Sequence, residues 1–266
     1  MYYAAMAVPG DAVPPPLRLI ADPVRWRLLR ELAHGDLRVR ELVAAVGEAQ
    51  NLVSYHLRRL RSGGLVTARR SSLDGRDTYY SLDLAGCAHA LTEAGAALHP
   101  GLAPAGPAAP TAGAGAPPWA GGTSRPRRVL FVCTGNSGRS PMAAALLRHS
   151  AGRWAHAASA GTRPRSLHPA AAAVLHDRYR IDISGHRPTH VAAVASEPFD
   201  YVISLCDKAR EACPEFAGSP RRVHWSLPDP AAGADSPGVV YARFDRLATE
   251  LTTRIDFLLP VLAEAG

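Results

Sequence analysis

Hydrophobic and polar positions in the first hundred residues follow two periods in succession. Three segments carry apolar residues at the spacing of an amphipathic helix and stop at glycine: residues 23–34, 39–46 and 49–62. The first begins with Asp22-Pro23, an N-cap side chain followed by proline at the first helical position. Two runs rich in β-branched and aromatic residues then predict a hairpin around the turn Asp74-Gly75: residues 65–70 and 78–82.

The third helical segment has an apolar face and a polar face. Val53, Leu57 and Leu60 are expected to point inward. Polar and basic residues occupy the opposite face and the hairpin: Gln50, Asn51, Ser54, Tyr55, Arg58, Arg59 and Arg61, then Arg69, Arg70 and Arg76. Amide and hydroxyl side chains read base edges, whereas arginines suit phosphates. A solvated helix face is the ordinary reading of such a charge run. It does not account for the hairpin, so the layout predicts an α+β winged helix-turn-helix domain.

The second half of the chain alternates strand patterns with helix patterns. The expected strands are residues 129–133, 157–162, 199–205 and 223–227, and the expected helices are residues 143–150, 169–179 and a last one from about 241. Such alternation predicts an α/β domain with a doubly wound parallel sheet. Ligands of these sheets bind at the carboxyl ends of the strands. Cys133, Cys206 and Asp229 each follow a strand, so we expect them to converge there.

A stretch rich in alanine, glycine and proline separates the two halves at residues 100–126. It has too few large apolar residues for a core and predicts a flexible linker. The short proline-rich stretch 1–16 is expected to be a disordered N-terminus. The chain therefore divides into an N-terminal domain at 17–99 and a C-terminal domain at 127–266.

Charge and cysteine content indicate which binding partners and which cellular compartment to expect. The formal net charge of the 266 residues is +7, which permits binding of nucleic acid or small anions. Four cysteines are too few for a disulfide scaffold, and no secretory signal precedes them. No apolar stretch approaches the roughly 20 residues that cross a bilayer. We expect a cytoplasmic protein without membrane contact, in which cysteines are more often catalytic than structural.

The stretch from Cys133 to Ser140 predicts an oxyanion site. A glycine-containing loop between a strand and a helix turns backbone N–H groups inward, and the helix N-terminus adds its positive end. Arg139 offers a two-pronged contact to a tetrahedral oxyanion, and the same field should lower the pKa of Cys133. The expected oxyanion-binding residues are Thr134, Gly135, Asn136, Ser137, Gly138, Arg139 and Ser140. A buried structural cysteine beside a helix cap would leave Gly135, Gly138 and Arg139 unexplained.

This cysteine, five residues, arginine-serine pattern after a strand resembles the low-molecular-weight tyrosine phosphatase family, whose superfamily includes arsenate reductases. The resemblance covers about residues 127 to 262. It implies that Cys133 is the nucleophile and that Asp229, held between two prolines, is the general acid. A turn aspartate is the plain alternative for Asp229.

Two further cysteines distinguish reduction from hydrolysis. Cys206 and Cys213 are separated by six residues, whereas a phosphatase needs only Cys133. Together with His224-Trp225 and the run from Pro228 to Ala231, this pattern resembles the arsenate reductase branch. The resemblance implies a relay in which Cys133 attacks arsenate, Cys206 attacks Cys133, and Cys213 attacks Cys206. The alternative to the relay is that Cys206 and Cys213 are merely small buried residues without a chemical role. Gly135 and Ser140-Pro141-Met142 look more like the phosphatases.

Four motifs of the N-terminal half together resemble the ArsR/SmtB repressor family: ADPVRWRLL at 21–29, VSYHLRRL at 53–60, GLV at 64–66 and YYSL at 79–82. The resemblance implies a homodimer on palindromic operator DNA. Many arsenic-sensing members carry a cysteine pair where this chain has Arg38 and Arg40, and arginine cannot ligate arsenite. Cys87 with His89 is a poor soft-metal site, so no metal site is predicted.

The sequence thus predicts a DNA-binding regulator fused to a thiol-dependent arsenate reductase. Its partners would be operator DNA, arsenate and an external thiol donor, which is thioredoxin, glutaredoxin or a low-molecular-weight thiol, with no bound cofactor. One alternative is a tyrosine phosphatase with a DNA-binding arm. The other is a regulator without enzymatic activity that senses an oxyanion.

Overall fold

The computed structural model describes residues 13–73, 75–99, 102, 125–233 and 236–264. Asp74, most of the expected linker and most of the expected disordered N-terminus lie outside these residues. Two compact units are present. The first contains residues 1–68 and 80–113, and the second contains residues 69–79 and 114–266. The boundary therefore runs through the hairpin, whose distal part, Arg69–Tyr79, belongs to the second unit.

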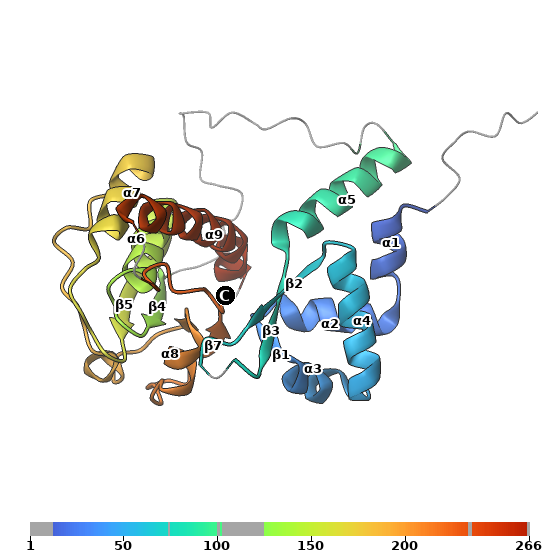
Figure 1. Ribbon diagram of the computed structural model, residues 1–266, viewed down its shortest axis with the longest axis horizontal. Coiled ribbons are helices and arrows are strands. Elements are labelled where there is room, and N and C mark those ends of the chain that lie inside the picture. The colour runs from blue at the N-terminus through green and yellow to red at the C-terminus, as the bar shows by residue number, and fades with distance from the viewer. Residues whose placement is uncertain (1–12, 74, 100–101, 103–124, 234–235, 265–266) are drawn as a thin grey trace, which may run out of the picture. The chain divides into compact units, whose positions relative to one another are not determined.

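The elements of the winged helix follow the predicted order (Figure 1). They are α1 (Pro15–Ile20), α2 (Pro23–Leu32), β1 (Leu37–Arg38), α3 (Val39–Val46), α4 (Gln50–Ser62), β2 (Val66–Arg70), β3 (Thr78–Leu82) and α5 (Leu84–Leu98). The strands form a sheet of order β1-β3-β2. Helix α1 and strand β1 are additions to the sequence prediction, because six and two residues are too few to show a period.

Capping explains where these helices begin and end. The Asp22 side chain accepts hydrogen bonds from the backbone N–H groups of Val24 and Arg25, at 3.0 and 2.9 Å. Helix α3 ends at Gly47 in the left-handed conformation, with φ 69°. The core of the unit contains the three residues expected to point inward from α4, namely Val53, Leu57 and Leu60, all fully buried.

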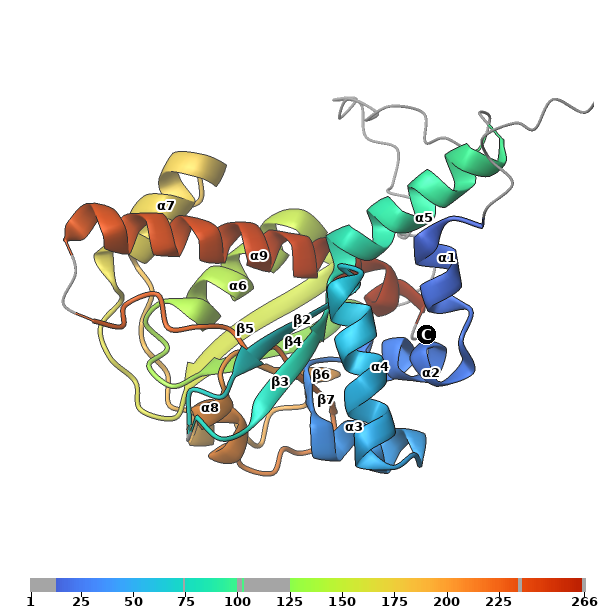
Figure 2. The same ribbon diagram turned by 45° about the vertical axis from the view of Figure 1, so that its right-hand side comes forward.

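The second unit is built on a parallel sheet, as predicted (Figure 2). Its elements are β4 (Arg127–Cys133), α6 (Arg139–Ala151), η2 (Gly152–Trp154), β5 (Ala155–Gly161), α7 (Pro169–Tyr179), η3 (Val191–Val194), β6 (Tyr201–Ser204), α8 (Asp207–Glu211), β7 (Arg221–His224) and α9 (Pro237–Glu264). The strand order is β5-β4-β6-β7. Helix α6 packs on β4 and β5, and α9 packs on α6 and α7.

Helix α9 begins earlier than the sequence suggests. It begins at Pro237, four residues before Tyr241, and continues through Pro260 to Glu264. A proline so close to the helix end removes only one backbone donor from the last turn. Phe244, Leu251 and Ile255 give the helix its buried face. No helix in the described part of the chain is long and apolar enough to cross a membrane.

Strand register sets the position of the site. Cys133 ends β4 opposite Gly161, the last residue of β5, and Val132 lies opposite Ser204, the last residue of β6. Parallel strands bring their carboxyl ends to one edge of the sheet. Cys133 and Cys206, which follows β6 by two residues, therefore meet at this edge.

Candidate functional site

Cys133 lies beneath a short loop that joins β4 to α6. Its Sγ is 3.0 Å from the Ser140 hydroxyl and accepts a hydrogen bond from the Asn136 backbone N–H at 3.2 Å. The side chain is almost completely buried. Helix α6 starts directly after Gly138, so its N-terminus faces the same loop. A backbone N–H therefore lies against the sulfur and the N-terminus of α6 faces the loop, an arrangement that suits a bound oxyanion.

Asn136 holds the loop in shape. Its backbone has φ 46°, a left-handed conformation that asparagine tolerates better than most residues. The side-chain amide donates to the hydroxyls of Ser140 and Ser159, both at 3.0 Å, and its oxygen accepts from the Thr189 N–H at 2.8 Å. Asn136 and Ser140 are fully buried and do not line the pocket described below. Among the predicted oxyanion-binding residues, these two support the loop.

Arg139 and Asp229 form an ion pair above the loop. Their closest atoms, Nη2 and Oδ2, are 3.6 Å apart. The arginine is largely buried and also donates to the Leu227 carbonyl at 3.2 Å, whereas 54% of the Asp229 side chain is exposed. The Asp229 carboxyl accepts from the Ala231 N–H at 3.2 Å. A fixed arginine and an accessible carboxyl are what a bound oxyanion and its leaving group require.

A pocket of about 350 Å³ brings most of the predicted residues together. The lining residues predicted from the sequence are Cys133, Thr134, Gly135, Ser137, Gly138, Arg139, Cys206 and Asp229. The Thr134 hydroxyl lies 3.2 Å from Cys206 Sγ. The loop of residues 134–138, called the oxyanion loop below after its predicted role, is therefore in direct contact with the second cysteine. The predicted convergence of Cys133, Cys206 and Asp229 is therefore present in the geometry.

Cys213 stands apart from this pocket. It follows α8, is partly buried and is not a lining residue. Burial raises the pKa of its thiol to about 11, against a smaller lowering by Arg222. All four cysteines, Cys87 included, are free thiols.

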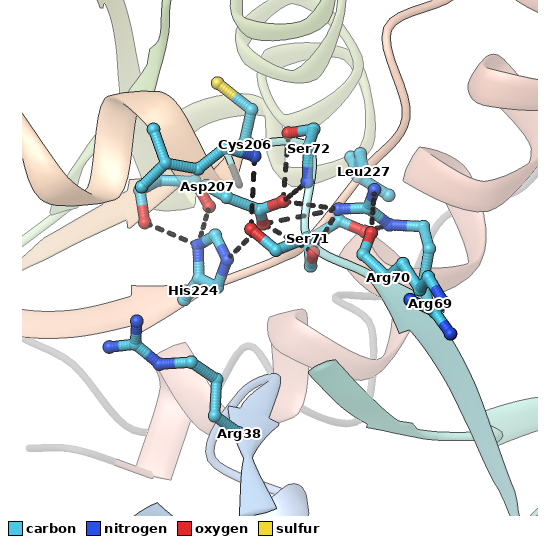
Figure 3. Close-up of polar contacts among 12 residues, drawn as sticks. Arg38, Arg69, Arg70, Ser71, Ser72, Cys206, Asp207, His224 and Leu227 are labelled. Atoms are coloured by element: carbon cyan, nitrogen blue, oxygen red, sulfur yellow. Dashed lines mark hydrogen bonds and ion pairs between the residues drawn. The ribbon is translucent and has the colours of Figure 1, made fainter. Parts of the chain in front are cut away.

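Asp207 is a site residue that the sequence reasoning missed. It follows Cys206 and is fully buried. Its carboxylate accepts a hydrogen bond from Ser226 Oγ at 2.6 Å and lies 3.1 Å from His224 Nε2 (Figure 3). Burial by itself raises the pKa of a carboxyl, but these hydrogen bonds, the Ser72 N–H and the nearby Arg69 charge hold the pKa of Asp207 far below its usual range. Asp207 could not be found from the sequence, because its burial depends on distant partners and produces no periodic pattern of apolar and polar positions.

Other contributors to the pocket and its loop were also missed. Arg165, Ser166 and His168 line the pocket from the segment before α7. Gly161 allows β5 to approach the loop, because a Cβ there would stand 2.8 Å from Asn136 N and Thr134 O. An arginine and a histidine in an irregular segment resemble ordinary surface residues until the fold places them, so no signal in the sequence could have found them.

The predicted DNA-binding face of α4 is open to solvent. Gln50, Asn51, Tyr55, Arg58, Arg59 and Arg61 are exposed and Ser54 is partly exposed. In the hairpin, Arg70 and Arg76 are exposed and Arg69 is partly buried. Burial raises the pKa of Cys87 in α5 to about 11. Within the described residues, no group of three or more His, Cys, Asp or Glu side chains is placed to hold a metal ion.

Both halves of the chain match known families. Residues 128–265 match the family described as low molecular weight phosphotyrosine protein phosphatase. Residues 22–68 match the family described as bacterial regulatory protein, arsR family.

Curated relatives cover the C-terminal half. An arsenate reductase 2 of Staphylococcus saprophyticus is 31% identical over 129 residues, 48% of this chain and 93% of that protein. An arsenate reductase of Bacillus cereus is 32% identical over 129 residues, 48% of this chain and 91% of that protein. A solved arsenate reductase in the oxidized state aligns with a TM-score of 0.45 and 26% identity, over 51% of this chain and 98% of that one.

Proposed function

The chain belongs to the low molecular weight phosphotyrosine protein phosphatase family, and we propose that it reduces arsenate in this domain and binds DNA through the arsR-type segment. The observation that carries the reductase assignment is the contact between Cys206 Sγ and the oxyanion loop, 3.2 Å from Thr134 Oγ1. Hydrolysis of a phosphate ester has no use for a second thiol at that place. The named relatives are arsenate reductases and support the same assignment.

The proposed reaction starts with arsenate in the pocket, held by the loop N–H groups and Arg139. The Cys133 thiolate attacks arsenic, an oxygen leaves as water after protonation, and a sulfur–arsenic(V) bond forms. Asp229 supplies the proton. Its carboxyl is exposed at the pocket and paired with Arg139, which suits a group that must meet solvent between turnovers.

Electron transfer follows from thiolate attack on the arsenic-bound sulfur. Cys206 attacks Cys133 Sγ, the Cys133–Cys206 disulfide forms, and the electron pair of the sulfur–arsenic bond leaves with arsenic as arsenite. Cys213 then attacks Cys206 and releases Cys133 as a thiolate. An external thiol donor reduces the Cys206–Cys213 disulfide. The two electrons lost by the cysteines equal those gained by arsenic.

Phosphatase activity is the second candidate, because the family and the loop both bind tetrahedral oxyanions. It would use Cys133, Arg139 and Asp229 alone. Ala231 follows Pro230 in the pocket lining. A methyl group at this point gives an aryl phosphate little surface to stack on, which favours a small inorganic substrate.

The deciding experiment measures arsenate-dependent turnover with thioredoxin and its reductase, in wild type and Cys213→Ser. Turnover that disappears in Cys213→Ser supports the three-cysteine relay. Unchanged turnover means that an external thiol resolves the intermediate. Absence of turnover with every thiol donor overturns the reductase assignment. Hydrolysis of an aryl phosphate would then favour the phosphatase, and arsenate-dependent DNA affinity would favour a regulator without enzymatic activity.

The DNA-binding half of the proposal rests on the exposed polar face of α4. Gln50, Asn51, Ser54 and Tyr55 would read base edges, and the arginines would contact phosphates. We propose a homodimer through this domain on a palindromic operator, in a reducing cytoplasm where a thiol donor is available. Electrophoretic shift with the promoter DNA of its own gene tests this half, and failure to bind that DNA overturns it.

A further inference from the structure

The carboxylate of Asp207 receives hydrogen bonds from the hairpin segment of the second unit, Arg69–Tyr79. The Ser72 backbone N–H and hydroxyl donate to its Oδ2 at 2.6 and 2.9 Å. Arg69 Nη2 donates to the same oxygen at 3.1 Å (Figure 3). Ser226 and His224 occupy the other oxygen, so the carboxylate is saturated. A buried charge is tolerated when it is paired in this way.

Arg69 is fully occupied by these contacts. Its Nε donates to the Ser226 carbonyl at 2.7 Å, its Nη1 to the Arg70 carbonyl at 3.1 Å, and its Nη2 to Asp207. Nη2 also contacts Ser226 Oγ. Each nitrogen of the guanidinium therefore has a partner. A DNA phosphate needs the same nitrogens, so Arg69 cannot serve a duplex and Asp207 together.

The hairpin has a second contact that keeps it in place. The ring of Tyr79 is 4.8 Å from the ring of His224, and the Arg210 guanidinium lies 5.5 Å from the Tyr79 ring centre. Tyr79 is fully buried by its surroundings. The hairpin contacts are thus gathered around the His224–Asp207 pair.

Asp207 lies next to the second cysteine of the proposed relay. Cys206 precedes it in the chain, and Cys206 Sγ contacts Thr134 Oγ1 of the oxyanion loop at 3.2 Å. Ser72 also lines the pocket that contains Cys133 and Cys206. Fixing the Asp207 carboxylate fixes the backbone from which the Cys206 thiol projects. The contacts of the hairpin with Asp207 therefore help to fix the position of the Cys206 thiol.

We propose that Arg69 and Ser72 are positioning residues for Cys206, and that DNA phosphates compete with Asp207 for Arg69. Binding of a duplex would then slow the attack of Cys206 on Cys133 in the same chain. The inference rests on the proposed function, because it links the DNA-binding half to the reductase half.

The test measures duplex affinity of the full chain by fluorescence anisotropy, with a labelled mixed-sequence duplex at low salt. Asp207→Asn frees Arg69 and should tighten binding roughly fivefold. Asp182→Asn is the matched control, because it removes the same charge from a carboxyl whose side-chain hydrogen bond is to its own turn, at Ser184 N–H. Equal affinities of the two variants overturn the inference. Failure of the wild type to bind any duplex overturns the DNA-binding proposal and the competition with it.

A second pair of variants, with smaller structural changes, tests the inference if Asp207→Asn does not fold. Ser72→Ala removes one hydrogen bond to Asp207, and Leu73→Ala alters an exposed neighbour in the same hairpin. Ser72→Ala should tighten duplex binding roughly twofold relative to Leu73→Ala. Indistinguishable affinities of this pair overturn the inference.

Turnover supplies a readout that a purely structural role would not move. Saturating duplex should lower the kcat for arsenate reduction and leave the KM for arsenate unchanged, because the first attack by Cys133 does not involve Arg69. Arg69→Ala should have a low kcat with and without duplex, and Arg69→Lys should recover part of it. A kcat that does not respond to duplex overturns the inference, whereas absence of reduction in every sample overturns only the proposed function.

Discussion

At the level of single residues, the site depends on how each functional side chain is held. Cys133 has Ser140 and the Asn136 N–H beside its sulfur, Arg139 has the Leu227 carbonyl, and Asp207 has His224 and Ser226. Each partner comes from another element of the second unit or from the loop itself. A substitution in one of these partners can therefore displace a functional side chain and leave its reactive group unchanged.

Asp229→Asn removes the proposed proton donor and leaves the shape of the pocket. We expect kcat for arsenate reduction to fall by about a hundredfold, the range of a lost general acid. Glu215→Gln, at a side chain that is 99% exposed, should leave kcat unchanged. Steady-state kinetics at saturating arsenate provide the measurement. Equal kcat values for the wild type and Asp229→Asn would remove Asp229 from the mechanism.

Cys213 should make its step strongly dependent on pH. Its thiol pKa is raised to about 11 by burial, so the thiolate is scarce at neutral pH. The rate of Cys206–Cys213 disulfide formation in a single turnover should rise about tenfold per pH unit as the pH approaches that value. Acid quenching followed by thiol alkylation and mass spectrometry measures it. A flat profile from pH 7 to pH 9 would contradict the assignment.

Asp207 should contribute stability that acid removes. Burial opposes its charge, but the hydrogen bonds and Arg69 hold its pKa below the ordinary value of about 4. A carboxylate with a lowered pKa stabilises the fold above that ordinary value, and its contribution is lost as the pH falls through its own pKa. Asp207→Asn should cost about 2 kcal/mol at pH 7.

The measurement is thermal unfolding of wild type and Asp207→Asn across a pH series. The difference in Tm should be constant above about pH 5 and should shrink in more acidic solution. A difference that grows on acidification would refute the sign of this argument.

At the level of elements, the site depends on the close approach of β5 to the oxyanion loop. Gly161 ends β5 opposite Cys133, and a side chain there would meet the backbone of Thr134 and Asn136. This backbone belongs to the loop that we propose binds the oxyanion, so a shift of the backbone would change the proposed cradle. Glycine at this position follows from the loop geometry and could not be assigned from the sequence pattern.

Gly161→Ala should damage the loop and the fold together. We expect a loss of about 1–3 kcal/mol in the free energy of unfolding and weaker binding of inorganic phosphate. Gly185→Ala is the matched control, because a Cβ there meets no atom within 4 Å. Thermal unfolding and calorimetric titration with phosphate measure both effects. Wild-type phosphate affinity in Gly161→Ala would show that the cradle tolerates the shift.

At the level of the whole molecule, the chain joins a winged-helix unit, for which we propose DNA binding, to a unit that carries the proposed oxyanion site. In the winged-helix unit, Arg38 and Arg40 stand where the resemblance to arsenic-sensing repressors would place a cysteine pair, and arginine cannot ligate arsenite. Cys87 is partly buried, and its raised pKa of about 11 opposes the deprotonation that metalloid binding requires. The described residues of this unit thus offer no soft-ligand cluster.

Arsenite should therefore leave the duplex affinity of the reduced protein unchanged. Anisotropy titrations with and without arsenite give the measurement, with Cys87→Ser as the comparison. Weaker binding in the wild type that is restored in Cys87→Ser would identify Cys87 as a sensor. Weaker binding in both proteins would place the sensor outside Cys87.

The sequence alone determined the two fold classes and pointed to the residues of the proposed chemistry. Helical periods, glycine stops and the alternation of strands with helices identify elements locally, because they reflect which face of each element is buried. Cys133, Arg139, Cys206 and Asp229 could be found because each stands at a fixed place relative to a strand end. Parallel topology then brings strand ends to one edge, so their convergence in the pocket was foreseeable.

Tertiary structure alone decided which residues support that chemistry. Asp207 is held by partners that are distant in the sequence, and Arg165 and His168 reach the pocket from an irregular segment, so no local period marks these three residues. Asn136 and Ser140 support the loop, because the buried Asn136 amide donates to the Ser140 and Ser159 hydroxyls and the Ser140 hydroxyl donates to the Ala160 carbonyl. Arg69, predicted as a phosphate contact, donates to the buried Asp207 carboxylate, a partner that no local pattern in the sequence indicated.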